Sequence, residues 1–189
     1  MHKDLVEHIK SFVGLSESDA TLLNKYIKRN HFKKKEIILH ENRVCNHLYF
    51  VEKGCLRMFF INKKGVEQVT QFALEGWWIS DFQSFINHTS SSYCIQTIEE
   101  SSIVSIESEN FEELLVELPQ LERYFRVIMQ KAVAAAQLRS KLLYEMSKED
   151  FYIHFSTSFP EFMLRVPQYM IASYLGLTPE YLSELRKKK

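Results

Sequence analysis

The spacing of hydrophobic residues changes along this chain, and each change predicts a different kind of element. Over residues 1 to about 30, apolar side chains recur at intervals of three or four, the period of an amphipathic helix. Ser16 and Asp19 stand three residues apart, as in the capping box that opens many helices. We therefore expect this first segment to be helical.

From Phe32 to Ile106 the helical period is lost, and short runs rich in β-branched and aromatic residues take its place. Turn signals such as Lys53-Gly54 and Glu75-Gly76 separate these runs. No helical segment alternates with them, which excludes a doubly wound α/β sheet. The segment is predicted to form a jelly-roll-like β-roll, and the fold class is α+β. The expected strands are EIILH, HLYFV, CLRMFFI, EQVTQFA, YCIQTI and SIVSI.

After Pro119, apolar residues again recur at spacings of three and four, as far as Met146. The pattern predicts one helix of about 27 residues, longer than most helices of globular proteins. Its middle, KAVAAAQL, has small side chains that let another helix approach closely. Such a helix either packs on its own domain or pairs with its twin across a two-fold axis, and we expect the pairing. The expected dimer interface is Leu121, Phe125, Ile128, Ala132, Ala135 and Leu142.

The residues after this helix predict two further parts. Ser147 with Asp150 resembles an N-cap pattern, which indicates a helix over residues 148–157. The stretch SFPEFMLRVP contains Pro160 and Pro167 and is expected to be a connector.

The last residues carry the pattern of a helix-turn-helix. A helix that begins at Gln168 is expected to end at Gly176, because glycine tolerates the positive φ found after many helices. Thr178 is a good N-cap for a second helix, and Pro179 suits its first position. The turn is then about three residues long, the length found in helix-turn-helix motifs.

The outward face of the second helix is the candidate base-reading surface. Glu180 can accept a hydrogen bond from cytosine N4, and Ser183 can bond to several bases. The cations Arg186 to Lys189 are expected to neutralise phosphates. Glu184 fits a solvated face equally well, because a carboxylate near phosphates weakens binding. The candidate DNA contacts are Gln168, Thr178, Pro179, Glu180, Ser183, Glu184, Arg186 and Lys187.

Composition narrows the class of protein. The formal net charge is zero, so only local charge placement can indicate nucleic acid. The first residues, MHKDLVEHIK, are charged where a signal peptide is apolar, and no apolar run is long enough to span a membrane. Three cysteines without CxxC spacing are expected to be buried, reduced thiols. These features predict a cytoplasmic protein.

The order of these parts resembles the Crp–Fnr family of bacterial transcription regulators over nearly the whole chain. The segment RVPQYMIASYLGLTPEYLSELRKK carries most of the resemblance and looks like short family members common in the Bacteroidetes, and LYFVEKGCLRMFF adds weaker support. The resemblance implies a sensor roll with N-terminal helices (1–117), a dimerisation helix (118–146) and a helix-turn-helix domain (147–189). It also implies a cytoplasmic homodimer that binds a pseudo-palindromic operator in double-stranded DNA, with RNA polymerase as a further partner.

This sequence departs from the family pattern in the DNA-binding part. Glu180 falls on the base-reading glutamate of the family, but Glu184 stands where an arginine is frequent. The sequence has no residues after Lys189 for the usual β-wing. Both departures concern operator sequence and affinity rather than the class of activity.

The roll also departs from the family's cyclic-nucleotide cassette, a Gly-Glu pair followed by an arginine that pairs with the phosphate. Ser80-Asp81 stands in place of Gly-Glu, and Ser91-Ser92 in place of the arginine. A buried phosphate without a cation is unfavourable, so cyclic AMP is not favoured and the effector stays unidentified. The candidate ligand contacts are Trp78, Asp81, Ser90, Ser91 and Ser92.

Two other classes of function stay open. The terminal helices can bind protein partners instead of DNA, with Glu184 opposing DNA contact. A metal-dependent roll enzyme is the third class, but His40, Glu41 and His47 do not form an HExxH pattern, so no metal site and no catalytic residues are predicted. Three cysteines in one chain also cannot supply the four ligands of an iron–sulfur cluster.

Overall fold

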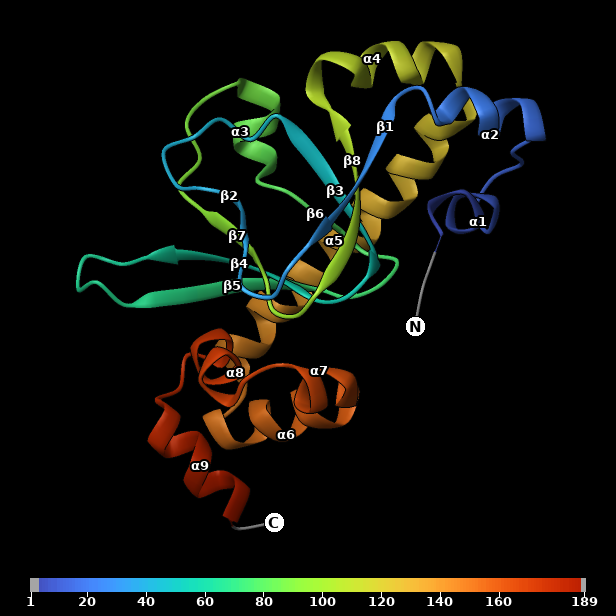
Figure 1. Ribbon diagram of the computed structural model, residues 1–189. Helices are drawn as coiled ribbons and strands as arrows, with labels where there is room; N and C mark the ends of the chain where they lie inside the picture. Colours follow the sequence, from blue (N-terminus) through green and yellow to red (C-terminus); the bar gives the residue numbers. More distant parts are fainter. Residues whose placement is uncertain (1–3, 188–189) are drawn as a thin grey trace.

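The computed structural model describes residues 4–187, and Figure 1 shows their arrangement. The strands are β1 (Ile27–Phe32), β2 (Ile37–Leu39), β3 (His47–Lys53), β4 (Leu56–Ile61), β5 (Glu67–Ala73), β6 (Trp78–Ile79), β7 (Cys94–Thr97) and β8 (Ser101–Glu107). The helices are α1 (Leu5–Lys10), α2 (Glu17–Leu23), α3 (Phe82–Asn87), α4 (Ser108–Glu117), α5 (Gln120–Glu145), α6 (Lys148–Ser158), α7 (Pro160–Arg165), α8 (Gln168–Leu175) and α9 (Pro179–Lys187).

The strands form a roll of two antiparallel four-stranded sheets. One sheet has the order β1-β8-β3-β6 and the other β2-β7-β4-β5. Alternate residues of each strand face a core between the sheets, such as Tyr49 and Val51 on β3 and Leu56 on β4. The expected β-roll and the α+β class are therefore confirmed.

The N-terminal segment is only partly helical. The capping box is present: Asp19 N donates to Ser16 Oγ, and Ser16 N donates back to the Asp19 carboxylate. However, Ile27 to Asn30 belong to β1, which pairs with β8, so the expectation of helix to about residue 30 is wrong. In this edge strand only Ile27 is fully buried. The strand therefore lacks the alternation of apolar and polar residues that would predict it.

Other short elements were not predicted either. Strand β6 has two residues, α3 has six, and α4 follows β8 directly. The expected connector SFPEFMLRVP contains α7, which begins at Pro160 in a position that proline favours. By contrast, Ser147 caps α6 as expected, since its Oγ accepts from Asp150 N at 3.1 Å.

Helices cover the outer faces of both sheets. On the β1-β8-β3-β6 sheet, Leu48 and Phe50 pack with α1, α4 and the start of α5. On the β2-β7-β4-β5 sheet, Phe59 and Phe72 pack with α6, α7, α8 and α9. Figure 1 shows α5 passing behind the roll between these two groups of helices. The long helix thus connects one outer layer to the other.

Helix α5 has 26 residues, close to the expected length, but its surroundings change along it. Leu121 and Phe125 are buried in the core beside β3, so these two predicted interface residues are not available to a partner. Ile128 is half-buried on the same cluster, and Leu142 packs against the C-terminal cluster. Residues 130–138 are exposed throughout. The predicted interface residues that lie in this exposed part are Ala132 and Ala135.

An ion cluster joins the roll to the C-terminal helices. Arg165 of α7 donates to both carboxylate oxygens of Glu75 at 2.8 and 2.9 Å and also to Glu99 Oε1. Burial raises the pKa of Glu75, but hydrogen bonds from Arg165 and from the Gly54 amide outweigh burial and hold this pKa below its ordinary value. The same contacts raise the pKa of Arg165. Both groups are therefore charged over the neutral range.

Within residues 4–187, no helix is both long and apolar enough to span a membrane.

Replacing Gly54 by alanine is expected to lower the free energy of unfolding by about 3 kcal/mol, from left-handed strain and overpacking. The φ of Gly54 is +105°, and an added Cβ would lie 2.8 Å from Ser101 Cα. Urea unfolding measures the change. Gly65→Ala is the control, because Gly65 has φ +74° but open space around it, and this variant should lose only about 1 kcal/mol. Equal losses in the two variants would contradict the packing argument.

Replacing Arg165 by methionine is expected to destabilise the protein by about 3 kcal/mol near neutral pH, because it leaves Glu75 buried without its cation. Since the folded-state pKa of Glu75 is depressed, the stabilisation is present above the unfolded pKa and is lost as pH falls through the folded pKa. The difference in the free energy of unfolding between Arg165→Met and wild type should therefore shrink below about pH 4.5.

Urea unfolding at several pH values tests this expectation. Lys28→Met, which removes an exposed ion pair with Glu107, is the control and should change stability little. If the difference in the free energy of unfolding between Arg165→Met and wild type stayed constant across the acid range, the role given to Glu75 would be refuted.

Candidate nucleic-acid interface

The first helix of the C-terminal pair ends as the sequence predicts. Helix α8 begins at Gln168 and buries Ile171, Ala172 and Leu175. Gly176 follows with φ +68° and ψ +32°, the left-handed conformation that glycine adopts without strain. The Leu177 amide then donates back to Ala172 O at 2.8 Å, a bond typical of a Schellman motif. The chain is thus turned sharply out of α8.

The second helix starts after a turn of three residues, Gly176 to Thr178. Thr178 caps α9, since its Oγ1 accepts from Tyr181 N at 3.2 Å, and Pro179 occupies the first helical position. Leu182 and Leu185 are buried against α8 and the rest of the C-terminal cluster. Because these two leucines face inward, the residues between them face outward.

The outward face of α9 is exposed in the part of the chain that the structure describes. Glu180, Ser183 and Glu184 are exposed and lie at helical spacing on the side opposite the two leucines. Arg186 and Lys187 are exposed in the last turn, where cations also favour the helix dipole. Lys188 and Lys189 lie outside the described residues. Thr178 and Pro179 are exposed at the start of the same face.

Gln168 differs from the other candidates. It is half-buried at the first turn of α8, and its Oε1 is buried without a hydrogen-bond partner among the described residues. Its contact with DNA stays a prediction. Two exposed aromatic residues were missed by the sequence reasoning: Tyr169 on α8 and Tyr181 on α9. Their hydroxyl groups are of the kind that contacts phosphates, and their exposure could not be read from an apolar pattern.

One arginine and one serine hold α8 in place. Arg139 of α5 donates to Tyr174 O at 2.8 Å, and its guanidinium lies 4.4 Å from the centre of the Tyr174 ring. Ser173 Oγ accepts from Val69 N and donates to Glu67 O, both at 2.9 Å. Burial is the main cause of the raised pKa of Tyr174, which keeps its hydroxyl neutral. The helix-turn-helix is therefore attached to α5 and to β5 at the same point.

The predicted ligand contacts in the roll do not line one cavity. Trp78 is a core residue: it is 7% exposed, and its Nε1 donates to Tyr124 Oη at 2.7 Å. Asp81 caps α3 by accepting from Gln83 N and Ser84 N, and Ser91 Oγ donates to its other oxygen at 2.7 Å. Asp81 and Ser91 are thus buried partners of each other, Trp78 is a core residue, and their contact with a ligand stays a prediction.

The other two predicted ligand contacts lie at the surface. Ser90 is exposed and forms an isolated bridge with Val44. Ser92 is exposed and lines a separate pocket with Glu41 and Tyr93. The five residues therefore divide between the core, a helix cap and the surface.

The three cysteines are buried free thiols, as predicted. Burial raises the pKa of Cys55 to about 12, so this thiol stays protonated. Across residues 4–187, no three His, Cys, Asp or Glu side chains are placed to share a metal ion.

The sequence of this chain is similar to those of known regulators. Residues 29–117 match the family model of the cyclic nucleotide-binding domain. The transcriptional activator protein Anr of Pseudomonas protegens is 26% identical over 185 residues, which cover 92% of this chain and 75% of Anr. The transcriptional activator protein FnrA of Stutzerimonas stutzeri is 28% identical over 187 residues, which cover 92% of this chain and 75% of FnrA.

Solved structures share the fold. The c-di-GMP-responsive regulator CLP of Xanthomonas campestris superposes with a TM-score of 0.72 at 16% identity, over 92% of this chain and 91% of CLP. FixK2 of Bradyrhizobium japonicum superposes with a TM-score of 0.69 at 19% identity, over 86% of this chain and 83% of FixK2. The chain is thus similar to these regulators through the roll, the long helix and the terminal helices, which follow one another in the same order.

Proposed function

We propose that this protein is a homodimeric transcription regulator in the cytoplasm that binds a pseudo-palindromic operator in double-stranded DNA. In this proposal residues 1–117 are the sensor roll, 118–146 the dimerisation helix and 147–189 the DNA-binding part. The observation that carries the proposal is the orientation of α9: its leucines are buried, while Glu180, Ser183 and Lys187 stay exposed. A folded helix with this division can enter a major groove without rearrangement.

The contacts on DNA divide by chemistry. Glu180 is the proposed base reader, because a carboxylate accepts from cytosine N4 in the major groove. Arg186 and Lys187 are proposed to neutralise phosphates, and the exposed hydroxyl groups near them to donate hydrogen bonds to phosphate oxygens. Glu184 is proposed to limit affinity, since no ion pair neutralises it within residues 4–187. RNA polymerase is the further partner expected at a promoter.

The dimer is proposed to form along the exposed part of α5. Residues 130–138 are accessible on all sides, and they include Ala132 and Ala135 as well as Val133, which is 57% exposed. Tyr144 lies on the same side of the helix as Val133 and is 91% exposed. Apolar side chains of this exposure on a long helix favour burial against a second copy of that helix.

The DNA contacts are tested by selecting duplexes from a random pool and measuring affinity by anisotropy. We expect an enriched palindrome and a steep loss of affinity with salt. Glu180→Gln should relax the base preference at one base pair per half-site. The expected loss is about 1–3 kcal/mol of discrimination against the wrong base. Lys187→Gln should weaken all sequences alike and reduce the salt slope by about 2 for the dimer.

Glu149→Gln is the matched control, an exposed carboxylate on α6 that lies outside the proposed interface. It should change neither specificity nor salt slope. Selection that enriches no motif, together with affinity that salt does not change, would refute DNA binding and favour protein partners for α9.

The dimer is tested by placing a charge on the exposed part of α5. Val133→Glu should dissociate the dimer into folded monomers in sedimentation velocity, because the charge would be buried between two copies. Val116→Glu is the control, since Val116 is an exposed valine on α4, at 76% exposure. A Val133→Glu protein that sediments like wild type would count against this interface.

A further inference from the structure

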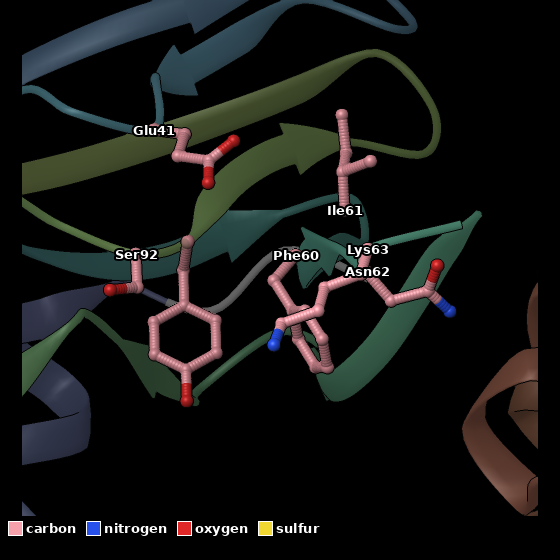
Figure 2. A pocket seen from close by; sticks show the side chains of 7 residues that line it. Glu41, Phe60, Ile61, Asn62, Lys63 and Ser92 are labelled. Carbon is pink, nitrogen blue, oxygen red and sulfur yellow. The ribbon is translucent and has the colours of Figure 1, made fainter. Parts of the chain in front are cut away.

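A pocket outside the Asp81–Ser91 pair lies between the β2–β3 connection and the β4–β5 hairpin. Its volume is about 440 Å³, within the range of small-molecule sites. Figure 2 shows Glu41 on one side of it and Phe60 with Lys63 on the other. The lining residues are Glu41, Phe60, Ile61, Asn62, Lys63, Ser92 and Tyr93.

The body of the pocket is apolar. Phe60 and Tyr93 are half-buried, and their ring centres lie 6.1 Å apart with the rings nearly perpendicular at 83°. Ile61 beside them is 48% exposed. These side chains offer contact to an aromatic or aliphatic group.

Two opposite charges lie at the edge of this apolar surface. Among residues 4–187, neither the Glu41 carboxylate nor the Lys63 ammonium group takes part in an ion pair or a side-chain hydrogen bond. The two other polar side chains of the lining differ from them. Asn62 Oδ1 is engaged, accepting from Lys64 N at 2.9 Å and Val66 N at 3.1 Å, whereas the Ser92 hydroxyl is exposed. The charges available to a ligand are therefore one anion and one cation.

The walls of the pocket are held by backbone hydrogen bonds. Asn42 N donates to Ser91 O and Ser91 N donates to Arg43 O, both at 2.8 Å. On the other side, Gly65 N donates to Asn62 O at 2.9 Å and closes the hairpin turn. Little ordering is needed on binding, which favours affinity.

We propose that this pocket binds a small zwitterion, a molecule with one ammonium group, one carboxylate and an apolar or aromatic body. An amino acid with an apolar side chain has this chemistry. The ammonium group pairs with Glu41, the carboxylate pairs with Lys63, and the body packs on Phe60 and Tyr93.

The position of the pocket links it to the helix-turn-helix. Phe60 faces Gln68 across the β4–β5 pair, and Gln68 Nε2 donates to Ser173 O on α8. The neighbouring Glu67 and Val69 bond to the Ser173 hydroxyl. A ligand that packs on Phe60 thus acts one strand pair away from the helix that carries α9. This link rests on the proposed DNA-binding function, whereas ligand binding itself does not.

Isothermal titration calorimetry of the full chain, without DNA, tests the site. The probes are L-phenylalanine and L-leucine, with phenethylamine and 3-phenylpropionate as analogues of phenylalanine that lack one charge. Phenylalanine should bind at least about 10-fold more tightly than either analogue, since each loses a charge-assisted contact. Glu41→Gln should remove the advantage over 3-phenylpropionate, and Lys63→Gln should remove the advantage over phenethylamine.

Lys64→Gln is the matched control, because Lys64 is the exposed neighbour of Lys63 and does not line the pocket. It should leave all affinities unchanged, and thermal unfolding of each variant reports whether it is folded. The proposal is overturned if neither amino acid binds at millimolar concentration, if the analogues bind as tightly as phenylalanine, or if Lys64→Gln acts like Lys63→Gln.

The link to α8 has its own readout. Saturating L-phenylalanine should change the affinity of wild type for a selected duplex several-fold, and Gln68→Met should abolish that change without altering phenylalanine affinity. If phenylalanine left the DNA affinity of wild type unchanged, the link would be overturned, but the proposed binding of phenylalanine would not. If the protein bound no duplex even without phenylalanine, the proposed DNA-binding function would instead be refuted.

Discussion

The placement of α9, the proposed DNA-reading helix, depends on how α8 closes the free edge of strand β5. Strand β5 is the last strand of its sheet, so its outer backbone groups need partners. The Ser173 hydroxyl supplies both a donor and an acceptor there, and Gln68 returns a bond to the Ser173 carbonyl. Arg165 adds a second attachment through Glu75 and Glu99. Helix α9 follows α8 through a three-residue turn, so these contacts fix its orientation as well.

This attachment joins the β-roll directly to the helix-turn-helix. The roll presents a sheet face that is covered by α7 and α8, on which α6 and α9 pack. Any change in the strands β4 or β5 therefore reaches the helix-turn-helix through direct contacts. The pocket beside Phe60 lies on this pair of strands, and the backbone of Ser91, the partner of Asp81, bonds to Asn42 and Arg43 in its other wall.

The Asp81–Ser91 pair satisfies two buried polar side chains within the roll. Asp81 uses one oxygen to cap α3 and the other to accept from Ser91. Both residues are buried, so each needs a partner inside the protein. Sequence reasoning could not specify this contact, because it depends on how the chain between Asp81 and Ser91 folds.

The sequence by itself determined features that depend on neighbours in the chain. Gly176, Thr178 and Pro179 fix the helix-turn-helix because positive φ, a side-chain cap and a restricted φ are local properties. Tertiary structure decided the rest. Edge strand β1 forms because β8 lies beside it, and Leu121 and Phe125 face their own core because the roll lies against that part of α5. Such contacts join residues far apart in sequence, so local periodicity cannot distinguish them from a dimer seam.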